Sequence, residues 1–224
     1  MAGTGRFAGW LFDLDGTLVD TAPDMTDTLF ELCRHYDAEP PDYGLARASI
    51  TNGAAGLIRL AFPGKSEQER QTLYEEYLRR YAEGVHRRSR LFDGMEDVLS
   101  ALEEQATPWG IVTNKPQALT DALLRGLGMD TRAAVTVGGD ALPERKPHPA
   151  PLLHAARRMT VDPGRCVYVG DNRRDIEAGR AAGMRTIAAS YGYLLPDDDI
   201  RRWQADVVIG HPDALMPMVR PGAV

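Results

Sequence analysis

The chain has 224 residues and carries 26 Lys and Arg against 32 Asp and Glu, so its formal net charge is −6. This acidic balance argues against a nucleic-acid partner, because binding to a phosphate backbone needs a basic surface. Hydrophobic residues make up 43% and charged residues 26%, which are ordinary globular values and exclude intrinsic disorder. A chain of this size buries roughly 70% of its unfolded surface, enough for one core with or without a smaller satellite domain.

The start of the chain and the cysteines indicate the cellular location. The segment from Met1 to Arg6 is small and polar, and no apolar run after it is long enough for a signal peptide or a membrane helix. Cys33 and Cys166 are too few for a disulfide scaffold and wrongly spaced for a metal site, so we expect two buried thiols. We therefore expect a cytoplasmic protein without a membrane partner.

Short apolar runs predict six buried strands, with amphipathic helical patterns between them. The runs are Trp10–Leu14, Trp109–Thr113, Ala134–Val137, Cys166–Val169, Arg185–Ala189 and Asp206–Ile209. Buried strands that alternate with helices form parallel sheets covered on both faces. The sequence therefore predicts an α/β fold with a doubly wound parallel sheet.

The segment between the first two predicted strands is much longer than a crossover needs. It contains three apolar faces at helical spacing, and Ser66 to Glu69 fits a capping box at the start of the third. The faces are Met25, Leu29, Leu32 and Tyr36; Ala54, Leu57, Ile58 and Ala61; and Leu73, Tyr77 and Tyr81. We expect a helical domain of residues 20–88, inserted after the first strand into a core of residues 1–19 and 89–224.

Two carboxylates directly follow the first predicted strand, in the motif Asp13-Leu14-Asp15-Gly16-Thr17. The four fixed positions of Asp-x-Asp-Gly-Thr arise by chance on the order of once in 10⁵ starting points. An ordinary turn with solvated Asp and Gly is the alternative, but carboxylates spaced by two can face one crevice. Open parallel sheets bind ligands beyond the carboxyl ends of their strands. The motif therefore predicts an active site at this strand end.

Further polar groups follow the next three predicted strands. They are Thr113-Asn114 after the second, Lys146 after the third, and Gly170-Asp171 with Asp175 after the fourth. Each alone is weak, because Gly-Asp-x-x-x-Asp occurs by chance in roughly one such chain in twenty and Thr-Asn is a common turn or cap. Their joint placement at successive strand ends predicts a single site.

This set of motifs resembles the haloacid dehalogenase superfamily of phosphohydrolases from Trp10 to about Ile209, and the helical insert resembles its cap domain. The resemblance implies a Rossmann-like core and a magnesium-dependent phosphatase that forms an aspartyl-phosphate. It implies the following roles: nucleophile for Asp13, general acid and base for Asp15, phosphate binding for Thr113 and Lys146 with Gly16, Thr17 and Asn114 beside them, and magnesium binding for Asp13, Asp15, Asp171 and Asp175.

The implied chemistry needs these residue types. An aspartate can accept a phosphoryl group covalently, as Asp13 would. Its charge would repel a phosphate dianion unless Mg²⁺ and Lys146 neutralised part of that charge. The leaving group needs a proton, so Asp15 must be protonated when substrate binds and must later deprotonate water.

Alternatives of other classes remain at this point. A dehalogenase does not need the acid at Asp15, which argues against that activity. A phosphomutase similar to beta-phosphoglucomutase stays possible, although Thr17 follows the commoner phosphatase pattern. A non-catalytic binding protein of the same fold would show no turnover of any phosphate ester.

The finer resemblance is to phosphoglycolate phosphatases, through Val19-Asp20-Thr21-Ala22-Pro23, and to their N-acetylmuramic acid 6-phosphate phosphatase branch, through Leu91 to Met95 and Tyr191 to Asp198. The resemblance implies a small phosphate ester as partner and a monomer or homodimer. Ser49, Thr51, Asn52 and Gly53 precede a predicted helix and are the candidate substrate loop. Arg47 and Arg59 are the candidate cations for a substrate carboxylate.

Overall fold

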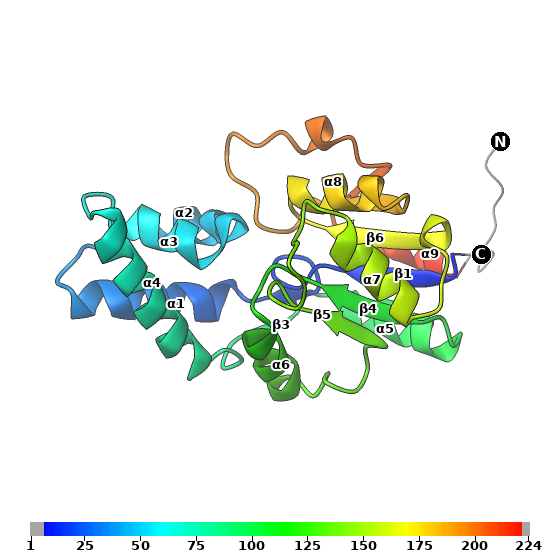
Figure 1. Cartoon of the computed structure of the whole chain (residues 1–224), viewed down its shortest axis with the longest axis horizontal. Helices are drawn as coiled ribbons and strands as arrows, with labels where there is room; N and C mark the ends of the chain where they lie inside the picture. The colour runs from blue at the N-terminus through cyan, green and yellow to red at the C-terminus, as the bar shows by residue number, and fades with distance from the viewer. Residues whose placement is uncertain (1–6, 221–224) are drawn as a thin grey trace.

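The computed structural model describes residues 7–220. The outermost parts of the predicted core, residues 1–6 and 221–224, lie outside this range, as does the expectation drawn from Met1 to Arg6. Along the long axis of the molecule, a helical segment stands beside a core built on a sheet (Figure 1).

The core sheet has six strands in the described part of the chain, all paired in parallel. They are β1 (Gly9–Phe12), β4 (Trp109–Val112), β5 (Val135–Val137), β6 (Cys166–Gly170), β7 (Arg185–Ala189) and β8 (Val207–Ile209). Their order is β5-β4-β1-β6-β7-β8, so the direction of winding reverses at β1. The predicted parallel sheet is confirmed, with strand ends within two residues of those expected.

Helices cover both faces of the sheet, as a doubly wound fold requires. Trp10 and Phe12 belong to a core that includes α5 (Met95–Glu104), α6 (Gln117–Gly126) and α9 (Met216–Val219). Leu11 points to the opposite face, where it packs with α7 (Ala150–Arg158) and α8 (Arg173–Ala181). Successive residues of a strand point to opposite faces, and this strand is apolar throughout because both faces are covered.

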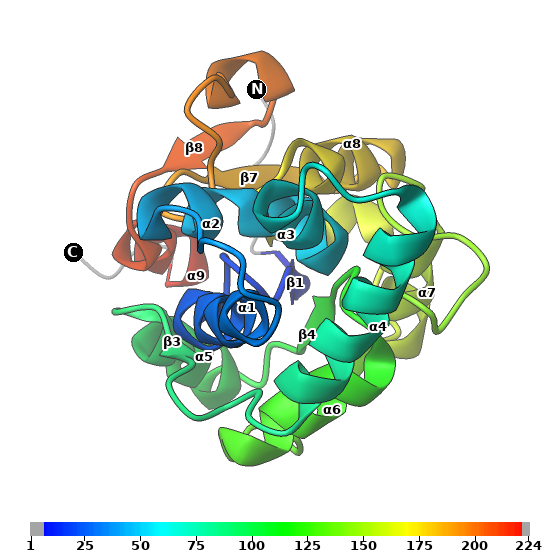
Figure 2. The same ribbon diagram turned by 90° about the vertical axis from the view of Figure 1, so that its left-hand side faces the viewer.

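The segment between the first strand and β4 is helical, and Figure 2 shows it from its own end, in front of β1. It contains α1 (Ala22–His35), α2 (Tyr43–Ser49), α3 (Gly53–Ala61) and α4 (Glu67–Ala82). The capping box that Ser66 and Glu69 predict is present at the start of α4. Short antiparallel strands, β2 (Val19–Asp20) and β3 (Arg90–Leu91), pair where the chain leaves and re-enters the core.

Two details of this segment differ from the sequence expectation. Tyr36 does not belong to the apolar face of α1, since it lies beyond the helix end, is 44% exposed and donates its hydroxyl to Glu76. Helix α2 was not predicted, because only Ala46 and Ser49 of its seven residues are buried and no apolar stripe marks it.

A buried carboxylate fixes the junction between the helical segment and the core. Asp24, on α1, accepts hydrogen bonds from the backbone N–H of Arg88 and from both the N–H and the hydroxyl of Ser89, at 2.7–3.0 Å. Backbone donors and a hydroxyl satisfy this charge, as burial of a carboxylate requires. The two connections to the core are therefore held side by side.

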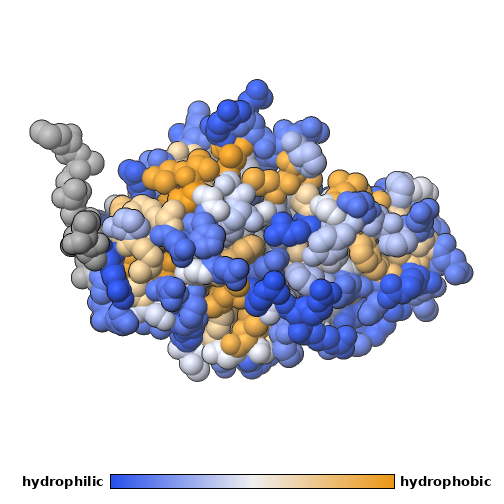
Figure 3. Space-filling view, turned by 180° about the vertical axis from the view of Figure 1, so that it is seen from behind, coloured by the Kyte–Doolittle hydropathy of each residue, from blue (hydrophilic) through white to orange (hydrophobic). Residues whose placement is uncertain are grey.

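The two cysteines and the surface show the character of an ordinary globular protein. Cys33 and Cys166 are free and buried, as predicted. Hydrophilic and apolar residues are interspersed on the rear surface (Figure 3). None of the described helices combines the length and the apolar character that crossing a membrane requires.

Candidate active site

A cavity of about 530 Å³ lies between the carboxyl ends of the core strands and the helical segment. It opens at β1, where the winding of the sheet reverses and open α/β sheets bind ligands. Core residues with ionisable side chains line it on one side, and residues of α1, α3 and α4 line it on the other. The carboxylates and lysines that follow separate strands are thereby brought together.

Asp13 follows β1 and forms the centre of the site with Lys146. The Lys146 ammonium lies 2.9 Å from Asp13 Oδ1 and 2.7 Å from Asp175 Oδ1; Lys146 and Asp175 are buried, and the Asp13 side chain is 13% exposed. Burial raises the pKa of Asp13 to about 6, although Lys146 acts in the opposite direction. Burial alone would lower the pKa of Lys146, but the two carboxylates outweigh it and raise that pKa, so the lysine is held as a cation.

Asp171 follows β6 and completes a group of three buried acids. Its carboxylate accepts hydrogen bonds from the Thr17 hydroxyl at 2.9 Å and from the Tyr193 backbone N–H at 2.8 Å. Burial, reinforced by the charges of Asp13 and Asp175, raises its pKa well above the ordinary value. Gly16 has φ +83° and passes so close that a Cβ there would collide with the Asp171 carboxylate and the Tyr193 ring, so the turn needs glycine.

The three acids fit a hard divalent cation. One carboxylate oxygen from each of Asp13, Asp171 and Asp175 lies within 4.8 Å of the others. Only oxygen ligands are offered, which Mg²⁺ prefers. Burial raises the pKa of Asp171 and the charges of Asp13 and Asp175 raise it further, while Lys146 pairs with those two acids and not with Asp171.

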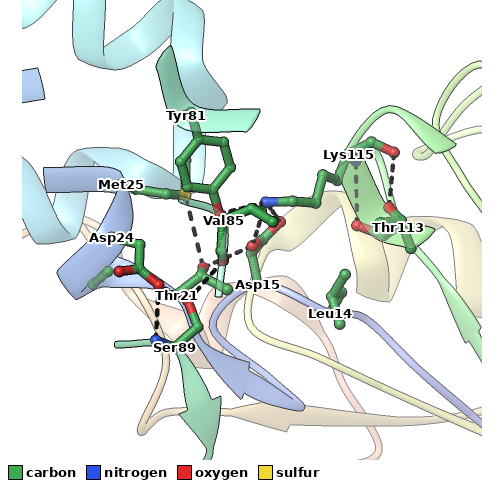
Figure 4. A network of polar contacts seen from close by, with 12 residues as sticks. Leu14, Asp15, Thr21, Asp24, Met25, Tyr81, Val85, Ser89, Thr113 and Lys115 are labelled. Carbon is green, nitrogen blue, oxygen red and sulfur yellow. Dashed lines mark hydrogen bonds and ion pairs between the residues drawn. The ribbon is translucent and has the colours of Figure 1, made fainter. Parts of the chain in front are cut away.

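Asp15 faces a cation that the sequence did not single out. Lys115 Nζ lies 3.0 Å from Asp15 Oδ1 and also donates to the Tyr81 hydroxyl at 3.0 Å, while the Thr21 hydroxyl donates to the same carboxylate oxygen at 2.7 Å (Figure 4). Lys115 belongs to the core and Tyr81 to α4, so this network joins the two parts of the molecule across the cavity.

The residues after β4 shape the opposite wall. Thr113 lines the cavity and is buried. Asn114 holds the loop that carries Lys146, because its side chain accepts from the Lys146 N–H at 3.1 Å and donates to the Lys146 carbonyl at 3.0 Å. Asn114 therefore fixes the backbone from which the buried ammonium extends.

Comparison with known proteins identifies the family. A family model described as haloacid dehalogenase-like hydrolase matches residues 10–189. The chain belongs to this family. The hydrolase is 46% identical to a phosphoglycolate phosphatase of Xanthomonas campestris, over 92% of this chain and 93% of that protein. It is 38% identical to an N-acetylmuramic acid 6-phosphate phosphatase of Pseudomonas aeruginosa, over 96% and 95% of the two chains.

A solved structure extends the likeness to the whole fold of the hydrolase. The crystal structure of a predicted phosphoglycolate phosphatase from Haemophilus somnus superposes with a TM-score of 0.87 at 27% identity, covering 97% of this chain and all of that one. The helical segment is included in this match, because the aligned part spans nearly the complete chain.

Part of the candidate substrate loop lies at the cavity. Thr51, Asn52 and Gly53 line it, at the start of α3. Ser49 is not among the lining residues and lies buried at the end of α2. Asn172 and Arg174, at the start of α8, bind Thr51 from the core side through its hydroxyl and its carbonyl.

The candidate cations of the helical segment lie elsewhere. Arg47 stacks over the Tyr193 ring at 4.8 Å from its centroid, and Arg59 borders a separate small surface pocket. Neither lines the cavity, whereas Arg145 and Arg174 of the core do. In the sequence, Arg145 and Arg174 are marked only by lying next to Lys146 and Asp175. An arginine beside a motif is usually a solvated surface residue, so this position alone does not predict a cavity residue.

Proposed function

We propose that this hydrolase is a magnesium-dependent phosphatase that transfers the phosphoryl group of a small ester first to Asp13 and then to water. The observation that carries the proposal is the buried Asp13, paired with Lys146 beside two further acids at the point where the sheet winding reverses. The named activity of its relatives agrees with this, since the proteins at 46% and 38% identity are both phosphatases.

Asp13 is suited to act as the nucleophile. Both the Lys146 ammonium and the Leu14 N–H contact Oδ1, whereas Oδ2 accepts no hydrogen bond from residues 7–220. Oδ2 would attack phosphorus, and the bond to the ester oxygen would break. Lys146 and Thr113 would hold the equatorial phosphate oxygens and neutralise their charge.

Asp15 would move the protons. It would give a proton to the departing ester oxygen, and then take one from the water that attacks phosphorus and releases phosphate from Asp13. Thr21 and Lys115 orient its carboxylate from two sides. Asp13, Asp171 and Asp175 would hold the magnesium ion together with the Asp15 backbone carbonyl, and the bound ion would supply charge neutralisation for the phosphate.

Residues 20–88 would form the cap domain and choose the leaving group, with the core built from the chain on either side. The cavity of about 530 Å³ lies in the range of roughly 300–1,000 Å³ that suits drug-sized ligands. The cavity has room for N-acetylmuramic acid 6-phosphate, which is the first candidate substrate. 2-Phosphoglycolate is the second candidate, because the relatives at 46% identity carry that name.

A panel of phosphate esters tests the proposal. The purified protein, with magnesium, should release phosphate from N-acetylmuramic acid 6-phosphate with a higher kcat/KM than from 2-phosphoglycolate or a nitrophenyl ester. Release from none of the esters would overturn the phosphatase assignment. Transfer of the phosphoryl group to a second position of a sugar, without free phosphate, would establish a phosphomutase instead.

A further inference from the structure

The cavity contains two arginines to which the proposed chemistry gives no task. Arg145 is exposed and Arg174 is half-buried, and both line the cavity. Neither forms an ion pair with any residue between 7 and 220. The Arg174 side chain instead donates from Nη2 to the Thr51 carbonyl at 2.6 Å. Its neighbour Arg173, by contrast, does not line the cavity and pairs with Glu177 at 2.8 Å.

The lysines of the cavity differ from these arginines because their charges are already matched. Lys146 pairs with Asp13 and Asp175, and Lys115 pairs with Asp15. A substrate phosphate would meet the Lys146 side of the site. The positive charges of the two arginines therefore remain for a second anionic group of the ligand.

We propose that Arg174 binds a carboxylate on the leaving group of the substrate, and that Arg145 adds positive charge from the loop before Lys146. This inference rests on the proposed phosphatase function and assigns a binding residue to the carboxylate that both candidate substrates carry. A guanidinium offers five N–H donors in a planar fork that matches a carboxylate, and the Thr51 carbonyl occupies only one of them.

The contact with Thr51 also orients this arginine. Asn172 donates to the Thr51 hydroxyl while Arg174 donates to the Thr51 carbonyl, so the loop before α3 is held against the start of α8. A guanidinium that is already held by one hydrogen bond loses less side-chain entropy when it binds a ligand. The carboxylate would thus lie at the seam between the helical segment and the core.

Matched pairs of esters test the proposal. N-acetylmuramic acid 6-phosphate is compared with N-acetylglucosamine 6-phosphate, which lacks the lactyl carboxylate, and 2-phosphoglycolate with 2-hydroxyethyl phosphate. Arg174→Gln should lower kcat/KM roughly 10- to 100-fold for the carboxylate member of a pair and less than about threefold for the neutral one. Arg174→Lys should fall between, because it keeps the charge and loses the fork. Arg173→Gln is the matched control and should change neither.

Each result decides a separate point. An equal loss on both members of a pair would mean that Arg174 acts on the phosphate or only holds the loop, and would overturn the proposal. The unsubstituted protein gives a second reading that does not depend on a variant: it should prefer the carboxylate member of at least one pair, and equal kcat/KM within both pairs would contradict the proposal. A wild-type protein that hydrolyses no ester refutes the phosphatase function itself. A higher kcat/KM for the carboxylate ester in only one of the two pairs identifies which carboxylic acid the arginine binds.

Discussion

The two walls of the cavity differ in chemistry. The core wall presents acids and lysines whose contacts at 2.7–3.0 Å hold one another in place, as between Lys146 and Asp175. The wall formed by the helical segment is mostly aromatic and aliphatic, with Tyr74 and Leu78 among its residues, and Thr51 and Asn52 supply its polar side chains. Chemistry that acts on the phosphoryl group alone can be built into the rigid sheet. In our proposal, the wall of the helical segment selects the leaving group together with Arg174 of the core.

The largest expected effect comes from the core wall. Asp13→Asn removes the attacking oxygen anion but keeps the size of the side chain, so turnover should fall by at least about 10⁴-fold on every ester. Phosphate release measures it. Asp130→Asn, an exposed acid of the same type, is the control and should keep full activity. Substantial activity of Asp13→Asn would remove Asp13 from the nucleophile role.

Asp15→Asn should separate proton transfer from attack. A general acid contributes about 10²- to 10⁴-fold, and only where the leaving group needs protonation. We expect a loss of that size on a sugar phosphate and a much smaller loss on a nitrophenyl ester, compared by single-turnover rates. An equally severe loss on both esters would contradict the role of Asp15 as acid.

Magnesium should stabilise the core wall in a pH-dependent way. Because burial raises the pKa of Asp13 from 3.8 to about 6, the metal-free folded protein retains a proton that the unfolded chain has lost, and its stability falls as the pH rises through this window. A magnesium ion binds these acids only when they are deprotonated. Once bound, it offsets the loss of stability that their ionisation causes. Magnesium at about 100 times its Kd should add about 2.7 kcal/mol, which is roughly 5–10 °C in Tm.

Thermal unfolding with magnesium or with chelator measures this effect. The gain in Tm should be larger at about pH 7.5 than at about pH 5, where protons compete for the same oxygens. Asp171→Asn should abolish the gain at both pH values. A gain that is unchanged or larger at the lower pH would contradict the assignment of the acids as ligands.

The smallest expected effect lies in the wall of the helical segment. Thr51→Ala or Asn52→Ala should change the ratio of kcat/KM between N-acetylmuramic acid 6-phosphate and 2-phosphoglycolate. Hydrolysis of a nitrophenyl ester should stay within about tenfold, or about 1.4 kcal/mol in barrier. Thr72→Ala, on an exposed part of α4, is the matched control. A uniform loss on all three esters would make the loop a structural element.

The sequence predicts that the residues of the core wall meet at one edge of the sheet, because that signal is local. Asp13 and Asp171 each follow an apolar run, and in a parallel sheet the carboxyl ends of such runs meet at one edge. No local pattern marks Lys115 or Arg174, whose roles depend on Tyr81 and Thr51 from the other part of the chain. Contacts between segments far apart in sequence follow from packing, which residue spacing does not record.

The helical segment was predicted less completely for the same reason. Its long helices have apolar faces, and they were found. Helix α2 is seven residues long and buries only two of them, so periodicity could not identify it. Arg47 does not itself line the cavity; its guanidinium stacks on Tyr193, since an aromatic face gives a cation a favourable partner.

The central claim is that the phosphoryl group passes through Asp13, and a rapid acid quench tests it most directly. Protein mixed with a readily hydrolysed ester and magnesium is quenched during the first turnover, digested, and its peptides are mapped by mass. The account predicts covalent phosphate on Asp13, within the peptide that also contains Asp15, and none in Asp13→Asn. Phosphate on another residue, or phosphate release in the first turnover with no covalent adduct on a protein shown to retain quenched acyl phosphates, would contradict it.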